Sequence, residues 1–147
     1  MEIPIDKAIS AFRSDYNCAQ SVLAAFSDQL NFDHQLAMCI SSGFGGGMGR
    51  LQKTCGAVTG AFMVLGIYNC EKHHSNQERK EHTYAMIQEF NRRFQERHGS
   101  CDCSTLLNCS LNTEEGKAFA RDNNLFELRC ETFIRDAIII LEDLMTG

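Results

Sequence analysis

The sequence predicts an all-α fold, a single compact bundle of six to eight helices in which a Gly-rich loop leads into a buried central helix. Apolar residues recur at intervals of three and four in most segments, and no stretch alternates convincingly with a period of two. Residues 54–70 carry no charge, which is typical of a helix that neighbours cover on every side. With 147 residues and no visible linker or repeat, residues 1–147 are expected to form one domain.

The first three helices are predicted from their caps. Pro4 suits the first turn of a helix, whose apolar spacing continues until a polar stretch interrupts it. Asn17 is a good N-cap for a second helix, which places Cys18 in the first turn. Asp33 can cap a third helix, which the Gly-rich loop ends.

Three further helices are expected after the central one. Ser75 and Glu78 have the form of a capping box and open a long amphipathic helix that reaches about Arg97. Thr113 opens a polar helix, and a last helix with a broad apolar stripe begins after Cys130. The apolar stripe of the long helix is predicted to contain Tyr84, Ile87, Phe90 and Phe94.

The centre of the chain joins a loop to the uncharged helix. Five glycines occupy residues 43–49, where they allow positive φ angles and the close approach of another backbone. Gly56 and Gly60 lie four apart, so one face of the helix is nearly flat and a neighbouring backbone is expected there. Thr54 is the predicted N-cap, which would put Cys55 in the first turn, where free amides and the helix dipole lower the pKa of a thiol.

Composition and charge bear on the protein's partners, its location and the chemistry of its cysteines. Lys and Arg number 14 against 19 Asp and Glu, a formal net charge of −5 that argues against a nucleic-acid partner. The first residues show neither a basic nor an apolar export region, so we expect a cytoplasmic protein. The uncharged run is shorter than the roughly 20 residues that a membrane span needs, so no membrane insertion is expected. Eight cysteines in a reducing compartment then indicate free thiols, metal ligation or redox chemistry.

Four of the cysteines lie where the chain enters a helix or a short turn. They are Cys18, Cys55, Cys103 and Cys130. If helix packing brings these ends together, four thiolates form a soft ligand set that suits an iron–sulfur cluster or zinc. Their separations along the chain do not decide this, because no local C-x-x-C pair is present.

The other four cysteines have simpler interpretations. Cys39 and Cys70 lie in apolar helical context and are expected to be small buried hydrophobic residues. Cys101 and Cys109 form a local cluster with Cys103, but this cluster lacks the second ligand pair of a zinc knuckle.

Three further patterns bear on a metal site, on nucleotide binding and on hydrolysis, and each of these is disfavoured. His74, Glu78 and His82 lie on one helix face and could bind a metal, but such a face is more often solvated. The Gly-rich loop lies near Arg50 and Lys53, yet it lacks the residue order of a phosphate-binding loop and follows no strand, so nucleotide binding is disfavoured. No arrangement of Ser, His and Asp or of paired carboxylates can be argued from residue order, which disfavours hydrolysis.

Six segments together resemble a known family. They are residues 17–23 (NCAQSVL), the Gly-rich loop, and residues 55–61 (CGAVTGA), 102–107 (DCSTLL), 113–116 (TEEG) and 130–137 (CETFIRDA). In this order they resemble the redox-active proteins with the C_GCAxxG_C_C signature, over nearly the whole chain. The resemblance implies a helical bacterial or archaeal domain. Its four signature cysteines correspond to Cys18, Cys55, Cys103 and Cys130, which we call the signature cysteines.

The resemblance leaves four cysteines outside the signature, namely Cys39, Cys70, Cys101 and Cys109. The chain departs from the family pattern at residues 108–109 and at Glu131, neither of which is a signature cysteine. A related module in the split-Soret cytochromes is associated with an iron–sulfur cluster, which is an argument by analogy for the same group here.

Three functions fit these residues. In the first, the signature cysteines hold an iron–sulfur cluster, or zinc as the alternative, for electron transfer or redox sensing. In the second, the same cysteines form a thiol/disulfide oxidoreductase in which Cys55 is the attacking thiolate. The third is a non-catalytic helical interaction domain with a structural metal or none.

In the first function, amides of the Gly-rich loop donate hydrogen bonds to sulfur and tune the reduction potential. The loop residues assigned to cofactor binding are Gly45, Gly46, Gly47 and Gly49. A redox partner is expected, although the sequence does not identify it. Small residues on the central helix could also form a homodimer face.

Overall fold

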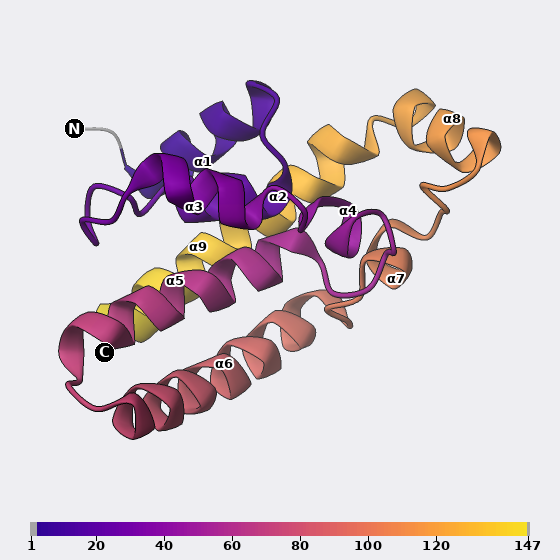
Figure 1. Ribbon diagram of the computed structural model, residues 1–147. Helices are drawn as coiled ribbons and strands as arrows, with labels where there is room; N and C mark the ends of the chain where they lie inside the picture. The colour runs from indigo at the N-terminus through magenta and orange to yellow at the C-terminus, as the bar shows by residue number, and fades with distance from the viewer. Residues whose placement is uncertain (1–2, 147) are drawn as a thin grey trace.

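The computed structural model describes residues 3–146, which form helices and connecting turns and, apart from these, one isolated β-bridge between Thr54 and Asp102 (Figure 1). The all-α prediction is therefore confirmed. The elements are α1 (Pro4–Arg13), α2 (Cys18–Ala24), α3 (His34–Ser41), α4 (Gly45–Met48), α5 (Gly56–Lys72), α6 (Asn76–His98), α7 (Cys103–Leu107), α8 (Glu114–Asp122), the π-helical turn η1 (Phe126–Cys130) and α9 (Glu131–Thr146).

The number of helices also agrees with the sequence. Within α4, Gly46 and Gly47 have left-handed backbone angles, so this segment is a turn of the Gly-rich loop rather than a regular helix. Without α4, eight α-helices remain in the described part of the chain, within the predicted six to eight. None of the helices between residues 3 and 146 is both long and apolar enough to cross a membrane.

α5 is the centre of the bundle and packs against α2, α6 and α9. Figure 1 shows it between α6 on one side and the N-terminal helices on the other. Its core residues Val58, Ala61, Val64 and Leu65 have no exposed surface, whereas its last turn, from Cys70 onward, is exposed. The prediction that this helix is covered on every side therefore holds only for its first part.

The flat face predicted for α5 is the face that receives α2. A Cβ atom at Gly60 would lie 2.8 Å from the carbonyl oxygen of Ala19, and one at Gly56 would lie 3.0 Å from the Cβ of Cys18. Both distances are shorter than ordinary van der Waals contact, so glycine at both positions permits the approach of the two helices. This close packing places Cys18 beside the start of α5.

The predicted caps are confirmed for four helices. The side chains of Asn17, Asp33, Ser75 and Thr113 each accept a hydrogen bond from an amide in the first turn of the helix that follows. The Asn17 cap is a complete capping box, because the amide of Asn17 also donates to the side chain of Gln20, over 3.0 Å.

The apolar stripe predicted for α6 was wrong at one residue, Tyr84. Tyr84 is 53% exposed, whereas Phe90 and Phe94 are fully buried. The stripe continues instead through Met86, which packs against the core one helical turn before Phe90. Tyr84 lies outside this stripe because the helical period carries its side chain toward solvent.

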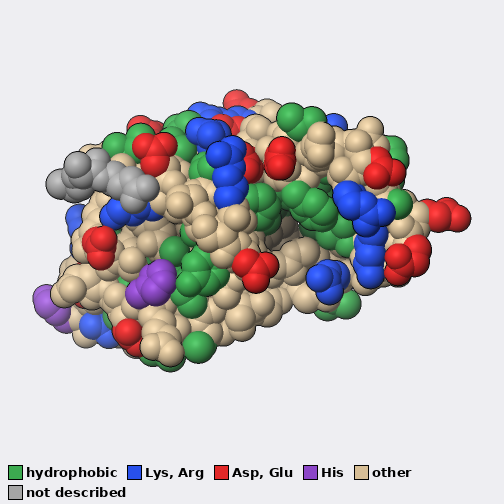
Figure 2. All heavy atoms as spheres, turned by 90° about the horizontal axis from the view of Figure 1, so that it is seen from above, with side chains coloured by type: hydrophobic (Ala, Val, Ile, Leu, Met, Phe, Trp, Pro, Cys, Tyr) green, Lys and Arg blue, Asp and Glu red, His purple; other side chains and the backbone are tan. Residues whose placement is uncertain are grey.

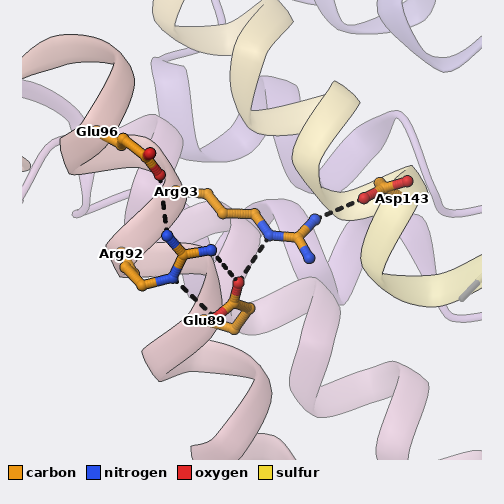
Figure 3. Close-up of polar contacts among 5 residues, drawn as sticks. All are labelled: Glu89, Arg92, Arg93, Glu96 and Asp143. Atoms are coloured by element: carbon orange, nitrogen blue, oxygen red, sulfur yellow. Dashed lines mark hydrogen bonds and ion pairs between the residues drawn. The ribbon is translucent and has the colours of Figure 1, made fainter.

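Five charged side chains connect α6 to α9 (Figure 3). Arg93 donates to Glu89 of its own helix over 2.9 Å and to Asp143 of α9 over 2.5 Å. Arg92 donates to Glu89 over 2.6 Å and to Glu96 over 2.9 Å. Hydrogen bonds from Arg92 and then Arg93 lower the pKa of Glu89 to about 2. Since most of these side chains are well exposed, the network orients the two helices more than it stabilises them.

Gly60→Ala should lower the free energy of unfolding by about 1–3 kcal/mol, because the added methyl group must push α2 away from α5. Gly66→Ala is the matched control. Its Cβ would meet no atom within 4 Å, and alanine is favoured over glycine in a helix interior by about 1 kcal/mol. Urea denaturation measures both variants, and equal effects would contradict the close contact at Gly60.

Glu89 should stabilise the protein at neutral pH and cease to do so in acid. Its pKa is lowered in the folded state, so its contribution is present above the pKa of an unfolded glutamate, about 4.3, and is lost as the pH falls toward about 2. In Glu89→Gln the free energy of unfolding should therefore decrease less between about pH 5 and pH 2 than in the wild type. Glu81→Gln, at an exposed position of the same helix, is the control. A decrease as steep in Glu89→Gln as in the wild type would exclude this residue as the cause.

Candidate functional site

The four signature cysteines line one pocket, although they come from four separate segments of the chain. Cys18 is the first residue of α2, Cys55 is the N-cap of α5, Cys103 is the first residue of α7, and Cys130 is the last residue of η1. Cys55, Cys103 and Cys130 are buried, and Cys18 is partly exposed. The pocket has a volume of about 940 Å³, and the space-filling view in Figure 2 shows the molecule hollowed on this face.

A short antiparallel contact holds Cys55 near Cys103. The amide of Cys55 donates to the carbonyl of Cys101 over 2.7 Å, and the amide of Cys103 donates to the carbonyl of Lys53 over 2.6 Å. These two bonds flank the isolated β-bridge. The start of α5 is thereby joined to the start of α7. Cys55 and Cys103, which lie at these two starts, are 48 residues apart in the sequence (103 − 55).

The other two signature cysteines meet between α2 and the start of α9. Cys130 is the largest cause of the raised pKa of the Cys18 thiol, so the two side chains are close enough to interact. Directly after Cys130, the buried carboxylate of Glu131 accepts two hydrogen bonds from Arg13 at the end of α1, over 2.9 and 2.8 Å. This pair fixes the start of α9 against α1. Glu131, one of the departures from the family pattern, therefore supports the position of Cys130.

The Gly-rich loop forms another wall of the pocket. Residues 46–50 all have positive φ angles, between 62° and 68°, so the chain makes a left-handed turn that glycine adopts without steric cost. A Cβ atom at Gly47 would lie 2.7 Å from the Cβ of Cys103. The turn thus lies directly against one of the signature cysteines, and a side chain at Gly47 would displace it.

Three amides of this loop have no partner. No acceptor among the described residues receives a hydrogen bond from the backbone N–H of Gly45, Gly46 or Gly47. All three residues line the pocket, and Gly47 is buried. Buried amides without a partner are rare in proteins, so a group bound in the pocket would find hydrogen-bond donors here. The amide of Gly49 donates to the carbonyl of Gly45 instead, so Gly49 shapes the turn.

Gln52 is a site residue that the sequence did not indicate. It is only 7% exposed and has a positive φ of 56°. Its amide group donates to the carbonyl of Cys109 over 2.7 Å and accepts from the amide of Leu111 over 2.8 Å. Gln52 also partly offsets the rise in the pKa of the Cys103 thiol. A glutamine in a polar loop carries no sequence signal for burial, because only the folded loops supply its partners.

Comparison with known proteins identifies the family but no individual relative. The family model described as "Putative redox-active protein (C_GCAxxG_C_C)" matches residues 16–144. The chain belongs to this family. The resemblance seen in the sequence is thereby confirmed, and the cysteines that we assigned to the signature are the four that line the pocket. A search of curated proteins and a search of solved structures found no match to the chain.

Burial controls the protonation of the thiols in this member of the C_GCAxxG_C_C family. The pKa of Cys103 is raised to about 11, with burial as the largest cause. The pKa of Cys18 is raised well above its ordinary value, first by the hydrogen bond with Cys130 and then by burial. These thiols are therefore neutral at physiological pH unless a bound metal removes their protons.

Cys55 differs in two ways from its predicted role. Thr54 was expected to cap α5, but Thr54 pairs with Asp102 in the β-bridge, so Cys55 is itself the N-cap and lies just before the first turn. Burial, the largest cause, raises the pKa of the Cys55 thiol by more than two amides of that turn lower it. The prediction of a lowered pKa was therefore wrong, and Cys55 in this state is a poor nucleophile.

The remaining cysteines do not line the pocket. Cys39 and Cys70 are exposed, so the prediction that both are buried was wrong. Each lies on the outward face of its helix, where the apolar sequence around it gave no sign of exposure. Cys101 is buried, and its thiol donates to the side-chain oxygen of Asn91 over 3.0 Å. Cys109 is partly buried.

The histidines near the start of α6 are arranged differently from the prediction. Glu78 lies 3.7 Å from His73 rather than pairing with His74. The ring of His73 stacks on that of His82, with centroids 3.8 Å apart and planes inclined by 6°. Lone pairs of parallel rings do not converge on one ion. Over residues 3–146, no group of three or more His, Cys, Asp or Glu side chains is placed to hold a single metal ion.

In native, metal-free protein at neutral pH, Ellman's reagent should react fastest with Cys39 and Cys70, because these thiols are exposed whereas most of the signature thiols are buried. The double variant Cys39→Ser, Cys70→Ser should lose the fast phase, and guanidinium should expose the remaining cysteines. A fast phase that persists in the double variant but disappears in Cys55→Ser would show that burial does not suppress the reactivity of Cys55.

Proposed function

We propose that Cys18, Cys55, Cys103 and Cys130 hold an iron–sulfur cluster, and that the protein transfers or senses electrons through it. The observation that carries the proposal is that these thiols, from four separate segments, line one pocket. Four cysteine thiolates are the usual ligands of [2Fe–2S] and [4Fe–4S] clusters. Membership of a family described as redox-active supports the redox part of the proposal and leaves the bound group open.

The chemistry of these thiols favours ligation over nucleophilic attack. Burial raises the pKa of Cys55 and of Cys103, and no cationic side chain in the described part of the chain lowers either pKa. A protonated, buried thiol is a weak nucleophile. A metal, in contrast, removes the proton from a thiol that coordinates it, and its positive charge offsets the cost of burying thiolates.

The arrangement also favours a cluster over a single zinc ion. Zinc requires its cysteine ligands around one point, each about 2.3 Å from the metal. No set of three such ligands is placed in this way among residues 3–146. A two-iron cluster takes its cysteines as two pairs, one pair on each iron. The effect of Cys130 on the pKa of Cys18 and the backbone pairing that joins Cys55 to Cys103 are consistent with such pairs.

Residues around the cysteines would hold and tune the bound group. An iron–sulfur cluster supplies one-electron oxidation and reduction. The unpartnered amides of Gly46 and Gly47 are available to donate to sulfur, which favours the more negative, reduced state and raises the reduction potential. Gln52 joins the loop after Cys103 to the end of the Gly-rich loop through its bonds to Cys109 and Leu111.

Protein purified without oxygen should be brown, absorb visible light, and contain iron and acid-labile sulfide. Replacing any one signature cysteine by Ser should lower the iron content at least about tenfold, because a coordination position is lost. Cys39→Ser and Cys70→Ser are matched controls that remove thiols outside the pocket, and both should keep iron and colour. Circular dichroism of each variant separates loss of the cluster from loss of the fold.

A protein that stays colourless and metal-free after reconstitution with iron and sulfide would reject this proposal. Zinc bound in a colourless protein, and lost from the Cys→Ser variants of the pocket, would replace the cluster by a single-ion site. Iron that is retained in all four variants of the pocket would show that the cluster is held elsewhere.

A second candidate is thiol/disulfide chemistry, which the effect of Cys130 on the pKa of the Cys18 thiol favours, together with the place of both residues in one pocket. In this case a disulfide forms between these two sulfur atoms by exchange with a partner's disulfide, whose S–S bond breaks and which takes up two electrons and two protons to become a dithiol. A thiol titration that changes by two per redox cycle, and no longer changes in Cys130→Ser, would support this function. The same titration unchanged by oxidation would reject it.

A further inference from the structure

The pocket is larger than the proposed redox group requires. Its volume of about 940 Å³ lies near the upper end of the roughly 300–1,000 Å³ found for small-molecule sites. A cluster of two irons and two sulfides would fill a small part of this space. Room for an organic molecule therefore remains beside the signature cysteines.

The walls of this space are largely apolar. Leu106, Leu107, Leu111 and Phe133 are buried in the core and line the pocket, whereas Tyr16 and Phe126 line it while being 36% and 41% exposed. In Figure 2, hydrophobic side chains surround the hollow, and both Lys or Arg and Asp or Glu side chains lie near its edge. Such a lining suits the hydrocarbon or aromatic body of a ligand rather than a bare inorganic ion.

The charges at the pocket are unusual for this chain. Arg50, Lys117 and Arg121 line it, against only two acidic residues, Asp15 and Glu127. The chain as a whole carries a formal net charge of −5, so the local excess of basic residues opposes the overall balance. An excess of positive charge in a hollow with apolar walls attracts anions.

Two of these basic side chains have acidic partners only at long distance, and the third has no acidic partner among the described residues. Lys117 lies 3.9 Å from Glu114 and Arg121 lies 3.9 Å from Asp122, both in exposed pairs. The guanidinium group of Arg50 has no acidic partner in the part of the chain that the structure describes. These basic groups are therefore available to a ligand at little cost.

We propose that this pocket binds a small organic anion, with an apolar body against Leu111 and Phe126 and its acidic group facing Arg50 and Arg121. The proposal rests on the proposed function in placing the ligand beside a redox centre, where the ligand is either a substrate or a signal. Binding itself depends only on the pocket and its charges.

Two dyes of similar shape test the proposal. Anilinonaphthalenesulfonate carries one negative charge and phenylnaphthylamine carries none, and both fluoresce more strongly in an apolar site. The protein as purified should bind the sulfonate more tightly than the neutral dye. In the double variant Arg50→Gln, Arg121→Gln, the affinity for the sulfonate should fall about tenfold, and that for the neutral dye should not change. Lys80→Gln, which removes an exposed cation of α6, is the control.

Equal affinity for the two dyes would overturn the proposal. An equal loss of affinity for the sulfonate in the double variant and in Lys80→Gln would also overturn it. Phe126→Ser should weaken the binding of both dyes. If this variant keeps both affinities, the ligand's apolar body does not lie against Phe126. The two proposals can fail separately. If the protein never holds iron but binds the dyes in a charge-dependent way, the anion site is supported and the cluster is rejected. If the protein holds iron but dye binding does not depend on charge, the cluster is supported and the anion site is rejected.

Discussion

The close contact between α2 and α5 is the constraint on which the rest of the structure depends. Gly60 and Gly56 leave space for the backbone of Ala19 and for the side chain of Cys18, respectively. With α2 in this position, the first residue of α2 lies beside the N-cap of α5. The same contact therefore builds the core of the bundle and brings the first two signature cysteines together.

The core and the candidate site share residues. Cys55, Cys103 and Cys130 belong to the continuous cluster of buried hydrophobic residues, and Phe133 of the core also lines the pocket. As neutral thiols, the cysteines behave as small apolar side chains. As ligands they would be thiolates that join α2, α5, α7 and the start of α9. Binding of a metal group and stability of the fold would then be coupled.

Local sequence signals succeeded where the physical cause is itself local. Asn17 and Thr113 cap helices through bonds to amides three residues away, and Pro4 begins α1 because its fixed φ suits a first turn. The prediction at Thr54 failed because a distant residue, Asp102, pairs with it. The prediction for Cys39 failed for a similar reason, since no element among residues 3–146 covers this side chain, which is exposed on α3.

The sequence by itself determined the helical class, most helix starts, the flat face of α5 and the family, because each follows from residue type and short-range spacing. Only the tertiary structure decided that four thiols line one pocket, that Gln52 is bonded to the loop after Cys103, and that burial raises the pKa of Cys55. Proximity and burial depend on how segments many residues apart pack together. The ionisation of a thiol follows its surroundings in the folded chain more than its position in a helix.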